Sequence, residues 1–207
     1  MPRSSEATRR RILDAAYELF YRRGFSRVGV DEIAELAAVT KRSLYYHFKS
    51  KDELLAAVLD LQHELSFAHI RKYEDRYCGD PDEIVSVLFS ELAKWSEKPG
   101  WAGTGFTRVA MELAGLPGHP ARGAARRHKA AREAWYAEIL AKARVASAPE
   151  RAREIALLAE GATALILIHG DRSYADAAAR AAKELLGKHR AKRAALDVSN
   201  GRNPRVE

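Results

Sequence analysis

The chain has a single cysteine, Cys78, among its 207 residues, and it lacks any long run of apolar residues. One cysteine excludes an internal disulfide framework and any zinc site built on several cysteines. The longest largely apolar run, 162–168, has seven residues, whereas a membrane-spanning helix needs about 20. The opening residues, MPRSSE, contain no apolar segment of the signal-peptide kind. We therefore expect a soluble, cytoplasmic protein without a membrane partner.

The alternation of apolar and polar residues that marks a half-buried strand is also absent. Apolar residues recur three and four positions apart instead, and this spacing predicts an all-α protein. No glycine-rich phosphate loop or nucleophile elbow is present. His63 and His69 are six residues apart, whereas two metal ligands on one helical face are about four apart. We therefore expect no enzyme activity, no metal and no cofactor.

Apolar spacing and capping signals together predict the helices. Thr40 is placed to cap one helix, Ser50 and Glu53 form a capping box for the next, and Asp80 followed by Pro81 begins another. The expected ranges are 5–23, 30–38, 41–48, 51–73, 81–95, 105–114, 121–145, 149–169 and 173–188. The periodicity fades beyond this point, so 189–207 are expected to form a basic, disordered tail.

Positive charge is concentrated at the two ends of the chain. Residues 1–51 carry a net charge of +5 and residues 188–207 carry +4, whereas residues 52–187 carry −2. This distribution favours an N-terminal unit that binds a polyanion, joined to a body with another role. Charge alone leaves open the alternative of a generally alkaline protein.

The segment 39–51, VTKRSLYYHFKSK, is the most informative about function. It is basic at both ends and has three consecutive ring side chains, Tyr45, Tyr46 and His47. Basic, tyrosine and histidine side chains can all donate to phosphate oxygens. A helix of about two turns is too short to be stable alone and needs a partner. A short basic helix supported by another short helix is the arrangement of a helix-turn-helix DNA reader.

These residues resemble the N-terminal signature of TetR-family transcriptional regulators. The likeness covers about 8–60, and it rests on Gly24-Phe25, Val30-x-x-Ile33-Ala34 and Ala37-x-Val39-Thr40-x-x-x-Leu44-Tyr45-Tyr46-His47-Phe48-x-Ser50-Lys51-x-x-Leu54. It implies an all-α homodimer with a three-helix DNA-binding domain at 5–65, whose helix-turn-helix motif spans about 29–48. A regulatory and dimerisation domain of roughly six helices would follow at 66–188.

The resemblance implies roles at the DNA for Thr40, Lys41, Arg42, Ser43, Tyr45, Tyr46, His47 and Lys51. Thr40 would cap the reading helix and contact phosphate, and the next three would lie at the end of this helix that enters the major groove. Tyr45 would touch a base or a phosphate. The last three would hold the DNA backbone, while Leu44 and Phe48 would be buried. Lys41 and Arg42 could instead contact phosphates alone. Tyr45 could be a packing residue, and His47 a plain surface histidine.

One position departs from the family pattern. The family usually has Thr or Ser before Val30, where the hydroxyl caps the second helix and contacts phosphate, and here the residue is Gly29. Glycine is tolerated as an N-cap but offers no side-chain oxygen. We expect a weaker contact at this position, with Arg27 or the backbone amides of the second helix as compensation.

The rest of the chain contains candidate pocket and interface residues. The pocket candidates are His63, Phe67, Trp95, Trp101, Phe106, Met111 and Trp135. Rings with a few polar groups suit an apolar small-molecule pocket, and ordinary core packing is the alternative. The last two helices, about 149–188, are rich in small residues. They are expected to form a hairpin that packs on a second copy, on its own domain, or on both.

The leading hypothesis from the sequence is a sequence-specific transcriptional regulator, by family norm a repressor. It would bind a palindromic double-stranded operator as a homodimer and be released by a small apolar or aromatic inducer, whose identity is unknown. The alternative is a ligand-independent or weakly specific DNA-binding protein. A third reading is a small-molecule binding module that has lost its DNA role.

Overall fold

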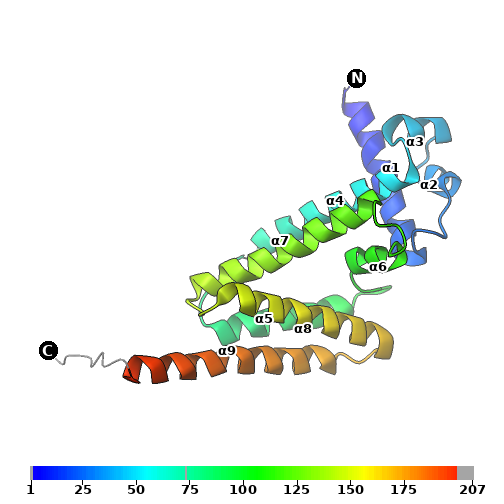
Figure 1. Cartoon of the computed structure of the whole chain (residues 1–207). Helices are drawn as coiled ribbons and strands as arrows, with labels where there is room; N and C mark the ends of the chain where they lie inside the picture. The colour runs from blue at the N-terminus through cyan, green and yellow to red at the C-terminus, as the bar shows by residue number, and fades with distance from the viewer. Residues whose placement is uncertain (1, 73, 200–207) are drawn as a thin grey trace. The chain divides into compact units, whose positions relative to one another are not determined.

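The computed structural model describes residues 2–72 and 74–199, and every regular element in these ranges is helical (Figure 1). The elements are α1 (Pro2–Arg23), α2 (Val30–Leu36), α3 (Lys41–His47), α4 (Lys51–Lys72), the short 3-10 helix η1 (Glu74–Tyr77), α5 (Pro81–Ser96), α6 (Gly105–Glu112), α7 (Pro120–Lys142), α8 (Ala148–His169) and α9 (Ser173–Ser199). The predicted all-α class is therefore confirmed. Among the described helices, none has the length and apolar character needed to cross a bilayer.

The chain divides into two compact units. The first consists of Met1–Lys72 and Ala102–Ala131, and the second of Tyr73–Trp101 and Arg132–Glu207. The N-terminal helices thus form one compact unit with α6 and the first half of α7, which the predicted domain ranges had assigned to the regulatory body. The ranges 5–65 and 66–188 remain a prediction of which residues bind DNA and which regulate, and they do not coincide with the two compact units.

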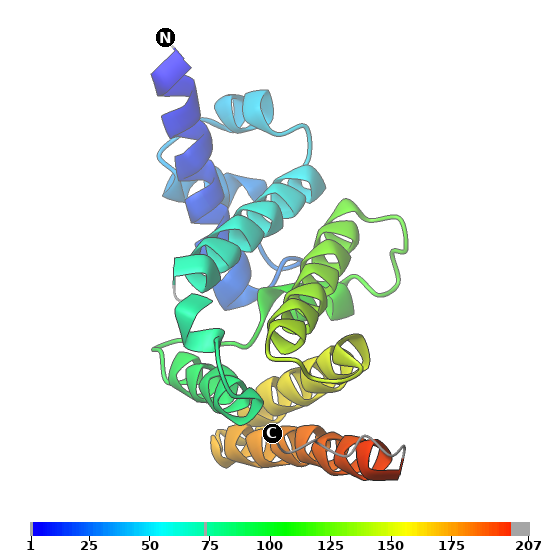
Figure 2. The ribbon, with the colours of Figure 1, turned by 90° about the vertical axis from the view of Figure 1, so that its left-hand side faces the viewer.

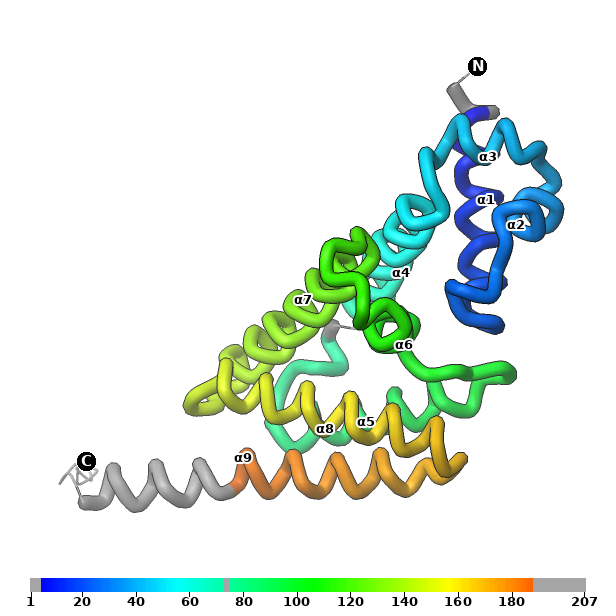
Figure 3. The backbone as a smooth tube through the Cα atoms, turned by 45° about the vertical axis from the view of Figure 1, so that its right-hand side comes forward, coloured from blue at the N-terminus to red at the C-terminus, as the bar shows by residue number. Residues whose placement is uncertain are grey.

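The first unit has a core built from apolar stripes on its helices. An apolar stripe on α1 is buried at Ile12, Ala15, Ala16 and Phe20, and α2, α3 and α4 add Ile33, Leu44, Phe48 and Leu54. The same core includes Phe106, Val109 and Leu113 of α6 and Ala121, Ala124 and Ala125 of α7. Figure 3 shows α1, α2 and α3 packed together, with α4 leading away from them.

Local caps begin and end these helices much as predicted. The Thr40 hydroxyl accepts the amide of Ser43 at 3.1 Å, and the Ser50 hydroxyl accepts the amide of Glu53 at 3.1 Å. The return bond of the predicted capping box differs, because the Glu53 carboxylate binds the amide of Lys49 rather than that of Ser50. α1 ends at Gly24, whose φ of 85° favours glycine.

The second unit contains α5, α8 and α9, which pack against one another (Figure 2). α8 and α9 bury small residues, including Ala152, Ala162, Ala175, Ala178 and Ala182, so their backbones can approach closely. The predicted end of the last helix at 188 is wrong, since α9 continues to Ser199. Its sequence AKRAALDVS lacks an apolar period but is rich in strong helix formers. The remainder of the predicted tail, 200–207, lies outside the described residues.

Candidate nucleic-acid interface

The turn between α2 and α3 fixes the orientation of the reading helix. Ala38 takes a left-handed φ of 51°, and the amide of Val39 donates to the carbonyl of Ala34 at 3.0 Å, which ends α2. On α3, Leu44 and Phe48 are almost completely buried, which confirms their predicted place in the core. With these two side chains inward, the opposite face of α3 is left to solvent.

The predicted DNA-contacting residues occupy that outer face and its two ends. Lys41, Arg42 and Tyr45 are exposed, and Tyr46 is 82% exposed, with its ring edge-on to His47 at 5.2 Å between centroids. Within the described residues, Arg42 forms no hydrogen bond or ion pair. An exposed tyrosine pair beside a free guanidinium is the kind of surface that can meet phosphates and base edges.

Lys41, in contrast, already has a partner. Its Nζ lies 2.9 Å from Oδ1 and 3.0 Å from Oδ2 of Asp31, the second residue of α2. The hydrogen bond and the negative charge of Asp31 raise the pKa of Lys41. Sequence reasoning missed Asp31. The sequence feature that could have indicated this ion pair is an acidic residue in the first turn of α2, ten positions before Lys41.

Lys51 packs against the turn that joins α1 to α2. Its Nζ lies 4.2 Å from the centroid of the Phe25 ring, a favourable cation–π arrangement. Burial lowers the pKa of Lys51, and the charges of Asp52, Glu112 and Glu32 act in the opposite direction. The ammonium is therefore held beside the α1–α2 turn rather than freely extended.

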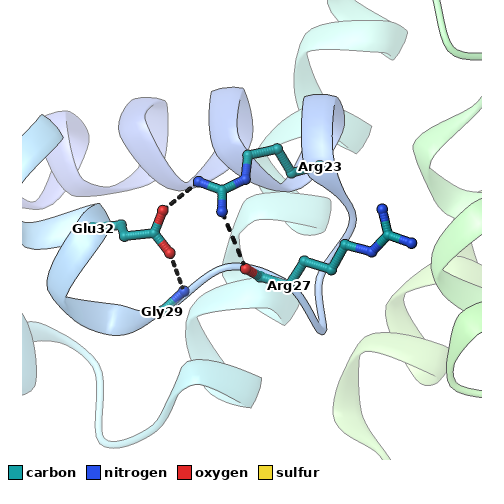
Figure 4. Close-up of polar contacts among 4 residues, drawn as sticks. All are labelled: Arg23, Arg27, Gly29 and Glu32. Carbon is teal, nitrogen blue, oxygen red and sulfur yellow. Dashed lines mark hydrogen bonds and ion pairs between the residues drawn. The ribbon is translucent and has the colours of Figure 1, made fainter.

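The position of Gly29 is supported by a neighbouring carboxylate (Figure 4). The amide of Gly29 donates to Oε1 of Glu32 at 3.0 Å, and the other oxygen of Glu32 binds Arg23. Arg23 also donates to the carbonyl of Arg27 at 3.4 Å, while the Arg27 side chain extends away from Gly29. The bond to Gly29 and then that to Arg23 lower the pKa of Glu32. The Glu32–Arg23 pair thus braces the start of α2.

A second carboxylate fixes the α1–α2 turn from α6. The amides of Phe25 and Ser26 donate to the two oxygens of Glu112 at 3.1 and 2.7 Å. Burial alone would raise the pKa of Glu112, but the hydrogen bonds from Ser26 and Phe25 outweigh it and hold the pKa below its ordinary value of 4.5. These contacts join residues 86 and 87 positions apart, so no sequence pattern indicated them.

A buried histidine completes this side of the first unit. His119 packs edge-on against the Phe25 ring at 5.6 Å and accepts the amide of Ala121 on Nδ1 at 3.2 Å. Its Nε2 lies 3.3 Å from Asp52 of α4. The segment between α6 and α7 is thereby tied to the same turn that Glu112 binds. The α1–α2 turn is therefore held by α6 and by the segment that precedes α7.

The predicted pocket residues are divided between the two compact units. In the first unit, His63 and Phe67 of α4 meet Phe106 of α6 around His128 of α7, a residue that sequence reasoning missed. Nδ1 of His63 lies 3.1 Å from Nδ1 of His128, and the Phe106 ring stacks on His128 at 3.6 Å. Met111, on the same unit, is 70% exposed and is the least supported member of the predicted pocket.

The tryptophans lie in the second unit. Trp95 and Trp101 pack edge to face at 5.5 Å. Trp135 packs against Tyr77 at 4.9 Å, with the guanidinium of Arg132 at 5.2 Å from its ring. These rings are well packed against partners within their own unit. A ligand pocket that uses them remains a prediction.

Comparisons with known proteins agree with this geometry. Residues 12–58 match the family model described as bacterial regulatory proteins, tetR family. TtgR, an HTH-type transcriptional regulator from Pseudomonas putida, is 47% identical over 92 residues, which are 42% of this chain and 44% of TtgR. The match therefore spans less than half the length of this curated relative.

Two solved structures extend the likeness over nearly the whole chain. One is described as a TetR transcriptional regulator from Streptomyces avermitilis. It is 30% identical, covers 85% of this chain and 98% of its own, and has a TM-score of 0.69. The other is a TetR-family transcriptional regulator from Streptomyces coelicolor. It is 25% identical, covers 89% of this chain and 96% of its own, and has a TM-score of 0.78.

Proposed function

The chain belongs to the TetR family of bacterial regulatory proteins, and we propose that it is a sequence-specific DNA-binding transcriptional regulator. The observation that carries this proposal is the outer face of α3. Leu44 and Phe48 anchor the helix, while Arg42, Tyr45 and Tyr46 stand exposed on it. A short helix with a basic, aromatic outer face fits the major groove of B-form DNA.

Each reading helix would combine base and phosphate contacts. Arg42 is suited to a bidentate contact with O6 and N7 of guanine, which discriminates between bases. Thr40, Ser43, Tyr46, His47 and Lys51 are suited to phosphates, which add affinity without sequence information. Lys41, at the end of the helix that would enter the groove, and Tyr45, on its exposed side, are suited to either a base or a phosphate. The proposed location is the cytoplasm, where bacterial chromosomal DNA lies.

We further propose that the protein acts as a homodimer through α8 and α9. The outer side of α8 exposes large apolar residues, with Leu157 at 69% and Ile168 at 71% exposure. Gly161 and Ala164 lie between them on the same helical face and are also exposed. Such a face is suited to a second copy of itself in a two-fold interface. Two reading helices about 34–36 Å apart would then match the half-sites of a palindromic operator.

The proposed regulation is release from the operator by a small apolar or aromatic ligand. Its support is the number of rings gathered in each unit, among them Phe106 against His128 and Trp95 against Trp101. Such a ligand would act only if it bound the DNA-incompetent conformation more tightly than the competent one. In that case the protein would repress transcription until the ligand arrived.

Selection of bound duplexes from random double-stranded DNA by the purified protein tests the proposal. We expect enrichment of one palindromic sequence with half-sites about one helical turn apart. Salt-sensitive binding without enrichment would support the alternative of a weakly specific DNA-binding protein. Absence of binding at any salt concentration would contradict a DNA-binding function.

A further inference from the structure

The two cations that begin the reading helix differ in their surroundings. Arg42 is exposed and forms no polar contact within the described residues, whereas both oxygens of Asp31 contact the ammonium of Lys41, at 2.9 and 3.0 Å. Both members of this pair remain accessible to solvent, with Lys41 53% and Asp31 76% exposed. The pair therefore stands at the surface where DNA would approach.

The other acidic side chain in the first turn of α2 does not compete for this role. Glu32 is occupied by the amide of Gly29 and by Arg23. Asp31 is thus the carboxylate that faces the reading helix, and it bridges α2 to the first residue of α3. Its position in the first turn also favours α2 through the helix dipole.

An ion pair at this place has a consequence for DNA binding. Sequence-independent affinity grows with the number of phosphates that free cations neutralise, because each contact releases condensed counterions. A lysine that is already neutralised by a carboxylate adds little to this term. Sequence preference, in contrast, comes from contacts to base edges. A carboxylate that withholds one cation from phosphate therefore lowers non-specific binding more than specific binding.

We propose that Asp31 is a positioning residue that sets the specificity of DNA binding by holding Lys41 away from indiscriminate phosphate contact. Arg42, which has no polar partner among the described residues, then remains the free cation near the start of this helix. This inference rests on the proposed DNA-binding function and deepens it, since it assigns a role to a residue that itself carries the wrong charge to bind DNA.

The test is the salt dependence of binding for the full chain and for D31N. The probes are the duplex recovered by selection and a scrambled duplex of equal length. Freeing Lys41 should steepen the slope of log affinity against log salt by about 0.9 for each reading helix. Over 50 to 200 mM salt, this corresponds to an additional loss of about half a decade in affinity per reading helix. At low salt, D31N should bind the scrambled duplex more tightly and so show a smaller ratio of specific to non-specific affinity.

Two further variants distinguish an effect through Lys41 from a general effect of net charge and from an effect of Asp31 that does not involve Lys41. D60N removes an exposed carboxylate that pairs with Arg127 at 2.9 Å on α4 and α7, so it changes net charge equally away from the reading helix. K41Q removes the side chain through which Asp31 is inferred to act. In the K41Q background, D31N should then alter the salt slope no more than D60N does. Thermal unfolding of each variant shows whether α2 and its neighbours remain folded.

Failure of the proposed role of Asp31 and failure of the proposed DNA-binding function give different results. If D31N and D60N change the slope equally, or if the D31N effect persists in the K41Q background, Asp31 does not act by holding Lys41 and the inference is overturned. If the wild-type chain binds neither duplex at any salt concentration, the proposed function fails first. A steeper slope in D31N alone, abolished by K41Q, supports the inference.

Discussion

At the residue scale, Arg42 is the side chain of α3 best placed for a base contact. It is exposed, it has no polar partner among the described residues, and it lies one position into a helix whose first residue is held by Asp31. Lys51 and His47 are less exposed, and contacts to the DNA backbone remain the prediction for both. The structure thus distinguishes residues that the sequence presents as one basic cluster.

Substitution of Arg42 by alanine should weaken operator binding and relax the preference at one position of each half-site. A bidentate arginine–guanine contact is worth about 1–3 kcal/mol of discrimination. Competition binding with operator duplexes changed at each position measures it. R126A is the matched control, because Arg126 is an exposed arginine of α7. An unchanged base preference in R42A would refute the base contact.

Substitution of Gly29 by serine should strengthen binding to all sequences alike. The backbone at this position is extended, with φ −83° and ψ 153°, and an added Cβ would lie 3.5 Å from Glu32, an ordinary contact. A hydroxyl that reaches phosphate would add about 0.5–1.5 kcal/mol per subunit. G29A is the control, since it adds the Cβ without the hydroxyl. Equal gains in G29S and G29A would show that the hydroxyl is not responsible.

At the element scale, the turn that leads from α1 into α2 is held by α6. Glu112 of α6 binds the amides of Phe25 and Ser26, and His119 packs against the Phe25 ring. These contacts lie within one compact unit. A displacement of α6 would therefore first move the α1–α2 turn.

The Glu112 contact predicts a pH-dependent stability difference between wild type and E112Q. Because the pKa of Glu112 lies below its ordinary value of 4.5 in the folded protein, its stabilisation is complete at neutral pH. It is lost as the pH falls through that depressed value. The loss in E112Q at neutral pH should be about 0.5–1.5 kcal/mol, near the lower limit because the carboxylate is largely exposed.

Thermal unfolding of both proteins across the acidic range measures this difference. The gap in Tm should be greatest near neutral pH and should close as the pH drops below 4.5. E138Q, which removes an exposed carboxylate paired with Lys142, should change Tm little. A gap between wild type and E112Q that stays constant with pH would contradict a stabilising charge on Glu112.

At the scale of the whole molecule, the proposed activity needs two copies of the chain. A single reading helix contacts one half-site, whereas a palindrome is recognised by two helices at fixed separation. The large apolar residues exposed on α8 are the face that we propose for this association. The long α9 runs beside α8 and packs on it (Figure 2), and we propose that both helices contribute to the interface.

Substitution of Ile168 by glutamate should dissociate the dimer without unfolding the chain, because this side chain is 71% exposed. Burial of isoleucine contributes about 1.5–3 kcal/mol, and a two-fold interface contains two copies. The dissociation constant should therefore rise roughly a hundredfold or more. Sedimentation or light scattering measures the change, with L116E as an exposed control in the first unit. A dimer that persists in I168E would exclude this face.

The sequence by itself determined the helical class and the position of α3, the proposed reading helix. Thr40 caps α3 and Leu44 and Phe48 anchor it, as predicted, because caps and apolar spacing act over a few neighbouring residues. The predicted end of the last helix at 188 failed for a related reason. Apolar periodicity is a signal of burial, whereas residues 189–199 of α9 lack that periodicity but are rich in strong helix formers.

Only the tertiary structure decided which partners the charged and aromatic side chains take. Lys41 pairs with Asp31, Glu112 reaches Phe25, and His128 stacks on Phe106. These partners are 10 to 87 residues apart in the chain, and nothing in a local pattern connects them. They meet because apolar faces pack the helices in one arrangement, and that packing sets which side chains come within a few ångströms of one another.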